Sequence, residues 1–274
     1  MMADIVELRE WFERERSFDT EHWELFLAAL ESGELSVVSQ DGSGAWQVHA
    51  WVKEAILSGF RRGGLHGWPW PEETTRDRCA FFDRPAFPPR RFHLEDGIRM
   101  VPGGSSVRRG AYVAKGVIIM PPSYINVGAW IGEGTMVDSH VLVGSCARIG
   151  AGVHLSAGVQ IGGVLEPPQA SPVIVEDHAF IGGLCGLFEG VIVRHHAVLA
   201  PGVILSKGTR IYDLVEGREL AGEVPPGAVV VPGTRPARGS YAQEQSLSLA
   251  APCIVKYRDE KTDSALELES ALRA

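Results

Sequence analysis

The stretch IGEGTMVDSHVLVGSCARIG, residues 131–150, carries an aliphatic residue at every sixth position: Ile131, Val137, Val143 and Ile149. This period matches neither a helix, which buries side chains about every 3.6 residues, nor a half-buried strand, which buries every second one. A short fixed period is typical of a solenoid, whose units bury their apolar side only by stacking on their neighbours.

The same spacing continues on both sides of this stretch and is interrupted twice. It covers nineteen positions, which are Val107, Val113, Ile119, Ile125, Ile131, Val137, Val143, Ile149, Leu155, Ile161, then Val175, Ile181, Leu187, Val193, Leu199, Leu205, Ile211, and finally Val224 and Val230. Glycines lie between the aliphatic positions, where the chain must bend. Three units per coil give about six coils, and a stacking distance of about 4.8 Å makes the prism about 30 Å long. The predicted fold class is therefore mainly β, a parallel β-helix of hexapeptide repeats.

The two interruptions are GVLEPPQASP at residues 163–172 and YDLVEGRELAGE at residues 212–223. Solenoids accept insertions at their corners, and such insertions often gather on a binding face. Two interpretations remain open. They are plain surface loops, or they form the wall of a cleft between coils or between subunits.

The segments on either side of the repeats differ in character, and three regions follow: a small α-rich N-terminal domain (1–95), the β-helix (96–235) and a C-terminal strand and helix extension (236–274). A first helix is predicted after Asp19 or Thr20, with Gly33 at its end. A strand pair around an Asp-Gly turn and a second helix over HAWVKEAILSGFRRGG, ending in glycines, follow, and then a connector rich in Pro and Trp, LHGWPWPEE. At the far end, a strand is predicted at 253–257, and the Thr-Asp-Ser sequence at 262–264 is expected to precede a short helix that runs to Leu272. One face of the first helix carries Trp23, Phe26, Leu27 and Leu30.

Composition narrows the class of protein. The 274 residues include 26 Lys and Arg against 34 Asp and Glu, and the net charge of −8 argues against a general nucleic-acid binder. No apolar run approaches the ~20 residues of a membrane span, and the charged start MMADIVELREWFERER lacks a signal-peptide core. The four cysteines have no metal-site spacing, so we expect no metal and a cytoplasmic protein with reduced thiols.

Residues 134–182, GTMVDSHVLVGSCARIGAGVHLSAGVQIGGVLEPPQASPVIVEDHAFIG, resemble the characteristic stretch of the tetrahydrodipicolinate N-succinyltransferase family. The resemblance extends to LESGELSVV and AWQVHAWVKEAIL before it, to GIRMVPGGSSVRRGAYVAKGVIIMPPSYINVGAW, and to GEVPPGAVVVPGTRP and PCIVKYRDEKTDSALELESALR after it. It implies a left-handed β-helix and a homotrimer with active sites between subunits. It also implies succinyl transfer from succinyl-CoA, a co-substrate rather than a permanent cofactor, to the amine of 2-amino-6-oxopimelate, on the diaminopimelate route to lysine.

Two residues match the substrate-binding positions of this family. Arg99, in GIRMVP, matches its substrate-binding arginine, and a guanidinium fork suits an acceptor that carries two carboxylates. Asp138, in MVDSH, matches its substrate-binding and catalytic aspartate, which can hold the substrate amine and accept its proton. The alternative for Asp138 is a turn residue that bonds to its own backbone.

Other candidates follow from the chemistry of the donor. Coenzyme A carries phosphates, which Lys207, Arg210 and Lys256 could meet, with Arg235 behind them, and a corner such as Gly202 would let the pantetheine arm approach the backbone. The alternative is a solvated charged face.

The histidines are a further set. His140 and His154 are weighed as a base, against packed or surface roles, and His195 and His196 as a solvated corner pair.

The chain departs from the family at one place. Where many members have an Arg followed shortly by a Glu, this chain has Gly183, Leu184, Cys185 and Gly186. We expect Cys185 to pack rather than to act as a nucleophile, because direct attack by an amine needs no acyl-enzyme. The missing charges leave two alternatives open: a related enzyme that uses acetyl-CoA on a similar amino diacid, as in tabtoxin-like specialised metabolism, or a β-helix scaffold without activity.

Overall fold

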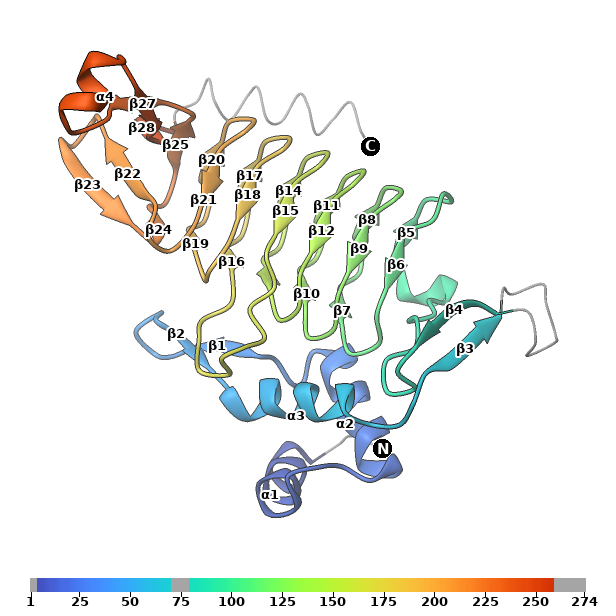
Figure 1. Cartoon of the computed structure of the whole chain (residues 1–274). Helices are drawn as coiled ribbons and strands as arrows, with labels where there is room; N and C mark the ends of the chain where they lie inside the picture. The colour runs from blue at the N-terminus through green and yellow to red at the C-terminus, as the bar shows by residue number, and fades with distance from the viewer. Residues whose placement is uncertain (1–3, 70–78, 259–274) are drawn as a thin grey trace.

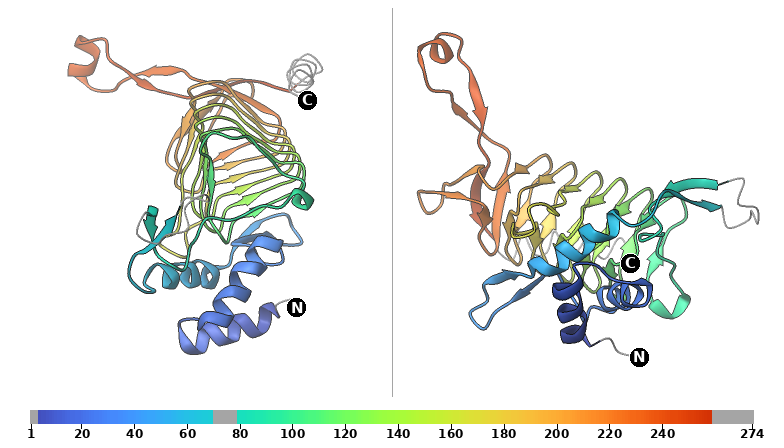
Figure 2. Two further views of the ribbon diagram at one scale, coloured as in Figure 1. Left: turned by 90° about the vertical axis from the view of Figure 1, so that its right-hand side faces the viewer. Right: turned by 60° about the horizontal axis from the view of Figure 1, so that its bottom comes forward.

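The computed structural model describes residues 4–69 and 79–258, and most of them form a prism of three parallel sheets (Figure 1). The end-on view in Figure 2 shows the triangular outline of the coils. We call the sheets the first, second and third faces. The first face comprises β7 (Tyr112–Val113), β10 (Trp130–Ile131), β13 (Arg148–Ile149), β16 (Ile174–Val175), β19 (Ile192–Val193) and β24 (Glu223–Val224).

The other two faces complete each coil. The second face contains β5 (Arg99–Met100), β8 (Ile118–Ile119), β11 (Met136–Val137), β14 (His154–Leu155), β17 (Phe180–Ile181), β20 (Val198–Leu199), β25 (Ala228–Val231), β28 (Cys253–Tyr257), β22 (Arg210–Asp213) and β23 (Arg218–Ala221). The third contains β6 (Ser106–Val107), β9 (Tyr124–Ile125), β12 (Leu142–Val143), β15 (Gln160–Ile161), β18 (Gly186–Leu187) and β21 (Ile204–Leu205).

The aliphatic residues that recur every six positions form the rows of side chains that point into this prism. From Val107 to Leu187, each hexad pairs in parallel with the third hexad after it, as Val137 does with Leu155, and Leu155 with Ile181. All nineteen aliphatic positions predicted from the sequence are buried. The mainly β, parallel hexapeptide architecture is therefore confirmed.

The corners between faces need a residue with positive φ, and glycine supplies it at most of them. His140, Leu184 and His196 take the same left-handed conformation, with φ near 60°. A side chain at such a corner points out of the prism rather than into its core, and Leu184 is 73% exposed.

Three α-helices lie in the described part of the N-terminal region. The helices are α1 (Ile5–Glu15), α2 (Thr20–Ser32) and α3 (Ala50–Phe60), followed by a 3-10 turn, η1 (Leu94–Asp96). Asp19 caps α2 and Gly33 ends it, and β1 (Val38–Gln40) pairs with β2 (Trp46–Val48) around the Asp-Gly turn. Four described elements of this region were not predicted: α1, η1, the strand β3 (His66–Pro69), which lies within the expected connector, and the strand β4 (Cys79–Asp83), which pairs with β3.

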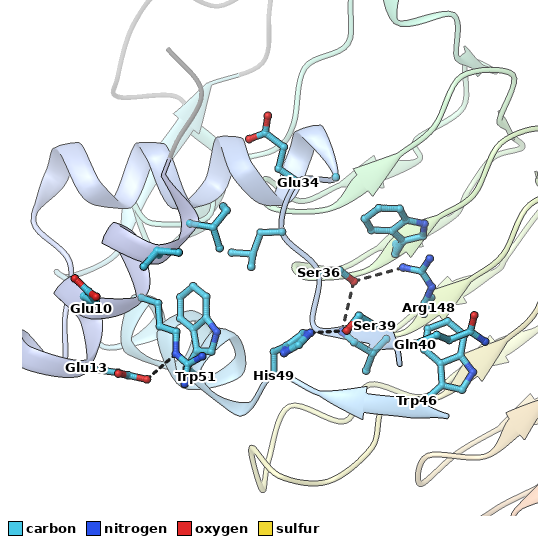
Figure 3. A pocket seen from close by; sticks show the side chains of 17 residues that line it. Glu10, Glu13, Glu34, Ser36, Ser39, Gln40, Trp46, His49, Trp51 and Arg148 are labelled. Atoms are coloured by element: carbon cyan, nitrogen blue, oxygen red, sulfur yellow. Dashed lines mark hydrogen bonds and ion pairs between the residues drawn. The ribbon is translucent and has the colours of Figure 1, made fainter. Parts of the chain in front are cut away.

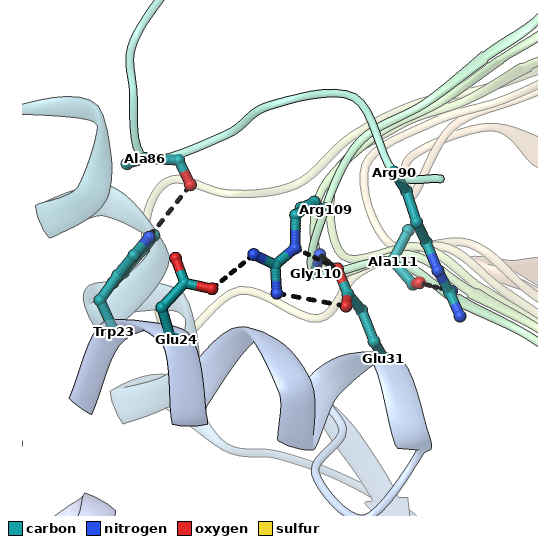
Figure 4. A network of polar contacts seen from close by, with 8 residues as sticks. All are labelled: Trp23, Glu24, Glu31, Ala86, Arg90, Arg109, Gly110 and Ala111. Carbon is teal, nitrogen blue, oxygen red and sulfur yellow. Dashed lines mark hydrogen bonds and ion pairs between the residues drawn. The ribbon is translucent and has the colours of Figure 1, made fainter. Parts of the chain in front are cut away.

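The helices pack on the first face of the prism and share a core with it. Val127 and Ile174 of the coils lie in the same buried cluster as α2 and α3. Figure 4 shows the polar part of this contact, in which Arg109 donates to Glu24 at 2.5 Å and to Glu31 at 3.1 Å. Glu31 also accepts the backbone N–H of Gly110 at 2.8 Å, so α2 is fixed to the first coil.

The first insertion packs against α3. Lys53 is fully buried, and its ammonium donates to the carbonyl of Ala170 at 2.7 Å and more weakly to that of Pro167 at 3.5 Å. Leu165 packs against the helix core. This insertion therefore lies over the N-terminal region of its own chain.

The C-terminal end of the prism is covered by strands that the sequence only partly predicted. The second insertion forms the β22–β23 hairpin, and β28 occupies the predicted range 253–257 between β22 and β25. An arm made of β26 (Thr234–Pro236), α4 (Ser240–Glu244) and β27 (Ser248–Ala250) projects from the prism (Figure 2). The short helix predicted after residues 262–264 lies outside the described residues. Within 4–69 and 79–258, no helix is long and apolar enough to cross a bilayer.

Candidate active site

Asp138 lies at the corner that follows β11, where the second face turns into the third. Its carboxylate accepts the N–H of Ser139 at 2.7 Å, and its own N–H donates to the carbonyl of Leu155 at 3.0 Å. The residue is half-buried, and within the described residues its second carboxylate oxygen makes no hydrogen bond. The turn bond to Ser139 and a role toward substrate are thus compatible in one side chain.

A buried hydroxyl supports this corner. Ser123, 5% exposed, donates to the carbonyl of Asp138 at 2.7 Å and accepts the N–H of Val141 at 3.3 Å. Sequence analysis missed Ser123, although a serine in an inward row of Ala and Val was visible. The signal is not specific, because Thr135 makes the same kind of bond, to the carbonyl of Gly150 at 2.8 Å.

Arg99 lies on the outer row of the second face, two strands from Asp138. It pairs with Ile118 on β8, which pairs with Met136 on β11, directly before the Asp138 corner. Two strand spacings correspond to about 10 Å. Arg99 is exposed, so its guanidinium is available on the same side of the prism as Asp138.

A shallow groove of about 320 Å³ adjoins the corner on the third face. His140 lines it, and its backbone carbonyl accepts a bond from the Gln160 amide at 3.2 Å. The groove is formed by Gly104, Ser106, Pro122, Ser123, Tyr124, His140, Val141, Leu142 and Gln160.

The other candidate histidines, His154, His195 and His196, each lie against another aromatic ring. His154 stacks on Phe180, with ring centroids 4.9 Å apart. His195 and His196 line a separate cavity of about 380 Å³ between the first face and the β1–β2 hairpin. None of these three rings lies at the Asp138 corner. Within the described parts of the chain, no group of three His, Cys, Asp or Glu is arranged to hold a metal ion.

The corners that stack on Asp138 form one edge of the prism, which we call the Asp138 edge. It runs through residues 120–123, 138–141, 156–159, 182–185 and 200–203, linked by backbone bonds such as Leu184 N–H to Ala157 and Gly202 N–H to Gly183. Gly202 is three rungs from Asp138, about 14 Å along the edge. The edge thus connects Asp138, the divergent Leu184 and the predicted pantetheine corner.

The predicted phosphate-binding cations do not gather on this edge. Lys207 lies in the turn at the other end of the third face, and Arg210 is paired with Glu219 at 3.0 Å. From the β22–β28 register, Arg210 and Lys256 are about 16 Å apart along the strands. Arg235, on the projecting arm, donates to the carbonyl of Pro236. A single copy of the chain therefore does not form one phosphate site from these residues.

Residues 183–186, where the chain departs from the family, pack as part of their own coil. Cys185 is fully buried, its thiol lies 3.2 Å from the carbonyl of Ala200, and burial raises its pKa. Both features oppose a nucleophilic role. A side chain at Gly186 would contact Phe188, and Leu184 lies over Gly158.

Comparison with known proteins agrees with this architecture. The family described as tetrahydrodipicolinate N-succinyltransferase N-terminal matches residues 9–61, and the hexapeptide repeat of succinyl-transferase matches 172–207. The chain is 44% identical to proteins of Rhodopseudomonas palustris and Bartonella henselae, both named 2,3,4,5-tetrahydropyridine-2,6-dicarboxylate N-succinyltransferase, over 90% of this chain and 87% of each relative.

A solved structure from Campylobacter jejuni, described as a 2,3,4,5-tetrahydropyridine-2-carboxylate N-succinyltransferase, shares the fold at 17% identity. Its TM-score is 0.58, and the match covers 85% of this chain and 63% of that one. On the sequence identity and the repeat architecture together, the chain belongs to the tetrahydrodipicolinate N-succinyltransferase family of hexapeptide-repeat acyltransferases.

Proposed function

We propose that this protein transfers the succinyl group of succinyl-CoA to the amine of 2-amino-6-oxopimelate, the open form of tetrahydrodipicolinate. The observation that carries the proposal is the 44% identity, over nine-tenths of the chain, with relatives named for this reaction. Asp138 and Arg99, on the same side of the prism, supply the two polar groups that the acceptor requires.

The reaction has a simple balance. The acceptor nitrogen attacks the thioester carbonyl, a C–N bond forms, the C–S bond breaks, and the thiolate of coenzyme A leaves. In our proposal, Asp138 holds the amine and accepts the proton that the nitrogen loses, which the departing thiolate can later receive. Arg99 binds a carboxylate of the acceptor through its guanidinium fork, which positions the amine.

The assembly belongs to the same proposal. Arg99 is exposed and the groove beside Asp138 is shallow, so a single chain does not enclose a substrate. A homotrimer of left-handed coils, with the site between neighbouring subunits, would enclose it and would bring cations of one subunit to the Asp138 edge of the next. We place this reaction in the cytoplasm, on the diaminopimelate route to lysine.

One observation favours a second candidate. Leu184 on the Asp138 edge and Gly186 at the start of β18 stand where many members of the family carry charge, so these two positions do not supply a receptor for a terminal succinyl carboxylate. A related enzyme that transfers acetyl from acetyl-CoA to a similar amino diacid fits that observation. The ratio of turnover with the two donors distinguishes these candidates.

Asp138→Asn tests the assignment of the base. The amide keeps the shape and removes the proton acceptor, and a positioned base contributes about 10²–10⁴-fold to rate. We expect turnover to fall by about 10²-fold or more while the circular dichroism spectrum and assembly stay unchanged.

Asp177→Asn is the matched control, because this carboxylate also sits at a prism corner and accepts a backbone N–H, that of Ala151 at 2.8 Å. It should retain turnover. Near-normal turnover of folded Asp138→Asn, or an equal loss in both variants, would refute the role of Asp138.

A further inference from the structure

A cavity lies away from the Asp138 edge, between the N-terminal region and the first face of the prism (Figure 3). Its volume is about 710 Å³, within the range of about 300–1,000 Å³ that small-molecule sites occupy. Helix α1, the end of α2, strand β1 and residues of β10 and β13 surround it. The lining includes three tryptophans, Trp46, Trp51 and Trp130.

Arg148 is the cation on the prism side of this cavity. Its guanidinium lies between two indoles, 4.4 Å from the Trp130 ring centroid and 5.2 Å from that of Trp46. Both rings are themselves fixed, since Trp130 packs at a tilt against Tyr112, with ring centroids 3.9 Å apart, and the Trp46 N–H donates to Glu176 at 2.9 Å. The guanidinium is therefore preorganised, with its flat faces covered and only its N–H edge left to bind.

The N–H edge of Arg148 has little to bind within the part of the chain that the structure describes. Its hydrogen bond to the Ser36 hydroxyl is long, at 3.5 Å (Figure 3). No described carboxylate lies within 4.0 Å of the guanidinium, the limit for an ion pair. Burial lowers the pKa of Arg148, which Asp177 and Tyr112 partly oppose. A buried cation that has no carboxylate in ion-pair contact among the described residues is costly, and an anion in the cavity would offset that cost.

The remaining wall limits the kind of anion. Glu10, Glu13 and Glu34 line the same cavity, and Arg9 already pairs with Glu13 at 2.8 Å. A highly charged group such as a phosphate would meet these carboxylates, whereas a single carboxylate can reach Arg148 alone. The tryptophans suit a flat or apolar body attached to it.

We propose that this cavity is a second binding site, separate from the acyl-transfer site, for a small monocarboxylate with a flat apolar body. The carboxylate binds the N–H edge of Arg148, and the body lies among the tryptophans. The site stands on the first face of the prism, whereas Asp138 and Arg99 stand at the second, so its occupant and the acceptor bind independently in space.

Benzoate, with its neutral counterpart benzamide, is a direct probe of this site. Tryptophan fluorescence and calorimetry on the full-length protein give the two affinities. We expect benzoate to bind about tenfold or more tighter than benzamide, since a charged hydrogen bond contributes about 1.5–3 kcal/mol. Equal affinities, or no binding of benzoate, would overturn the proposal without any mutation and without bearing on the acyl-transfer activity.

Two variants locate the binding. Arg148→Gln should abolish the preference for benzoate, and Arg99→Gln, which removes the same charge from the candidate acceptor site, should preserve it. The opposite pattern would assign benzoate to the acceptor site and refute the second site. If Arg148→Gln does not fold, Arg148→Lys replaces it; this variant keeps the charge but loses the fork, and an undiminished preference there would contradict the role of Arg148.

Discussion

The thiol of Cys146 should make the protein lose stability in alkali. Cys146 is 1% exposed at the contact between the coils and the N-terminal helices, and burial raises its pKa from an ordinary 9.0 to about 12, against the opposing charge of Lys53. Above pH 9.0 the unfolded chain releases this proton while the folded chain retains it. The contribution of the buried thiol to stability is therefore complete below pH 9.0 and is lost as the pH rises toward about 12.

The expected size follows from the two pKa values. At about pH 10.5 the unfolded thiol is ionised and the folded one is not, so the loss is about 2 kcal/mol, at about 1.4 kcal/mol per pH unit. Urea unfolding between about pH 8 and pH 10.5 measures it for the wild type, Cys146→Ala and Cys253→Ala. Replacing Cys146 removes packing contacts at every pH. Only the way in which the difference in unfolding free energy between the wild type and Cys146→Ala changes with pH therefore reports on the thiol.

We expect the stability gap between the wild type and Cys146→Ala to shrink by about 2 kcal/mol across this range. Cys253→Ala, which removes a half-buried thiol elsewhere in the chain, is the control. Lys53 titrates in the opposite sense, because burial lowers its pKa, but all three proteins contain it. A gap for Cys146→Ala that stays constant from about pH 8 to pH 10.5 would refute the reasoning.

Three further perturbations test the prism and its edge. Leu155→Ala, at a fully buried inward position, should cost about 2–5 kcal/mol in urea unfolding, whereas Ile204→Ala, 53% exposed, should cost less than about 1 kcal/mol; equal costs would contradict the inward row. Arg99→Lys should raise the KM for the acceptor and leave that for the acyl-CoA unchanged, because lysine lacks the two-pronged geometry; the reverse would move Arg99 to the donor site. Leu184→Arg, at an exposed corner, should raise the turnover ratio of succinyl-CoA to acetyl-CoA about tenfold, and an unchanged ratio would place recognition of the succinyl carboxylate elsewhere.

The repeat region could be predicted from sequence because its geometry is local. Each hexad makes one strand and one corner, so an inward aliphatic residue must return every six residues, and all nineteen did. Helix α2 could be predicted for the same reason, since Asp19 and Gly33 mark its ends. Helix α1 escaped prediction because only Leu8 and Phe12 are buried in an otherwise charged segment.

Features that depend on contacts between residues far apart in the sequence could not be predicted from the sequence. Lys53 lies in a helix, where a lysine is usually exposed, and the carbonyls that bind it come from the first insertion more than a hundred residues later. The arm formed by β26, α4 and β27 buries little of its own surface, so its sequence has no apolar period. Asp138 and Arg99 came from the family resemblance, and their roles remain predictions.

Release of free thiol from an acyl-CoA in the presence of 2-amino-6-oxopimelate tests the central claim most directly. The purified protein should release thiol from succinyl-CoA only when the acceptor is present, and mass spectrometry should find the acceptor heavier by one succinyl group. Acceptor-dependent release from acetyl-CoA alone would contradict the succinyl assignment and support the acetyl-transferring candidate. No acceptor-dependent release from either donor by a folded protein would contradict the enzymatic function itself.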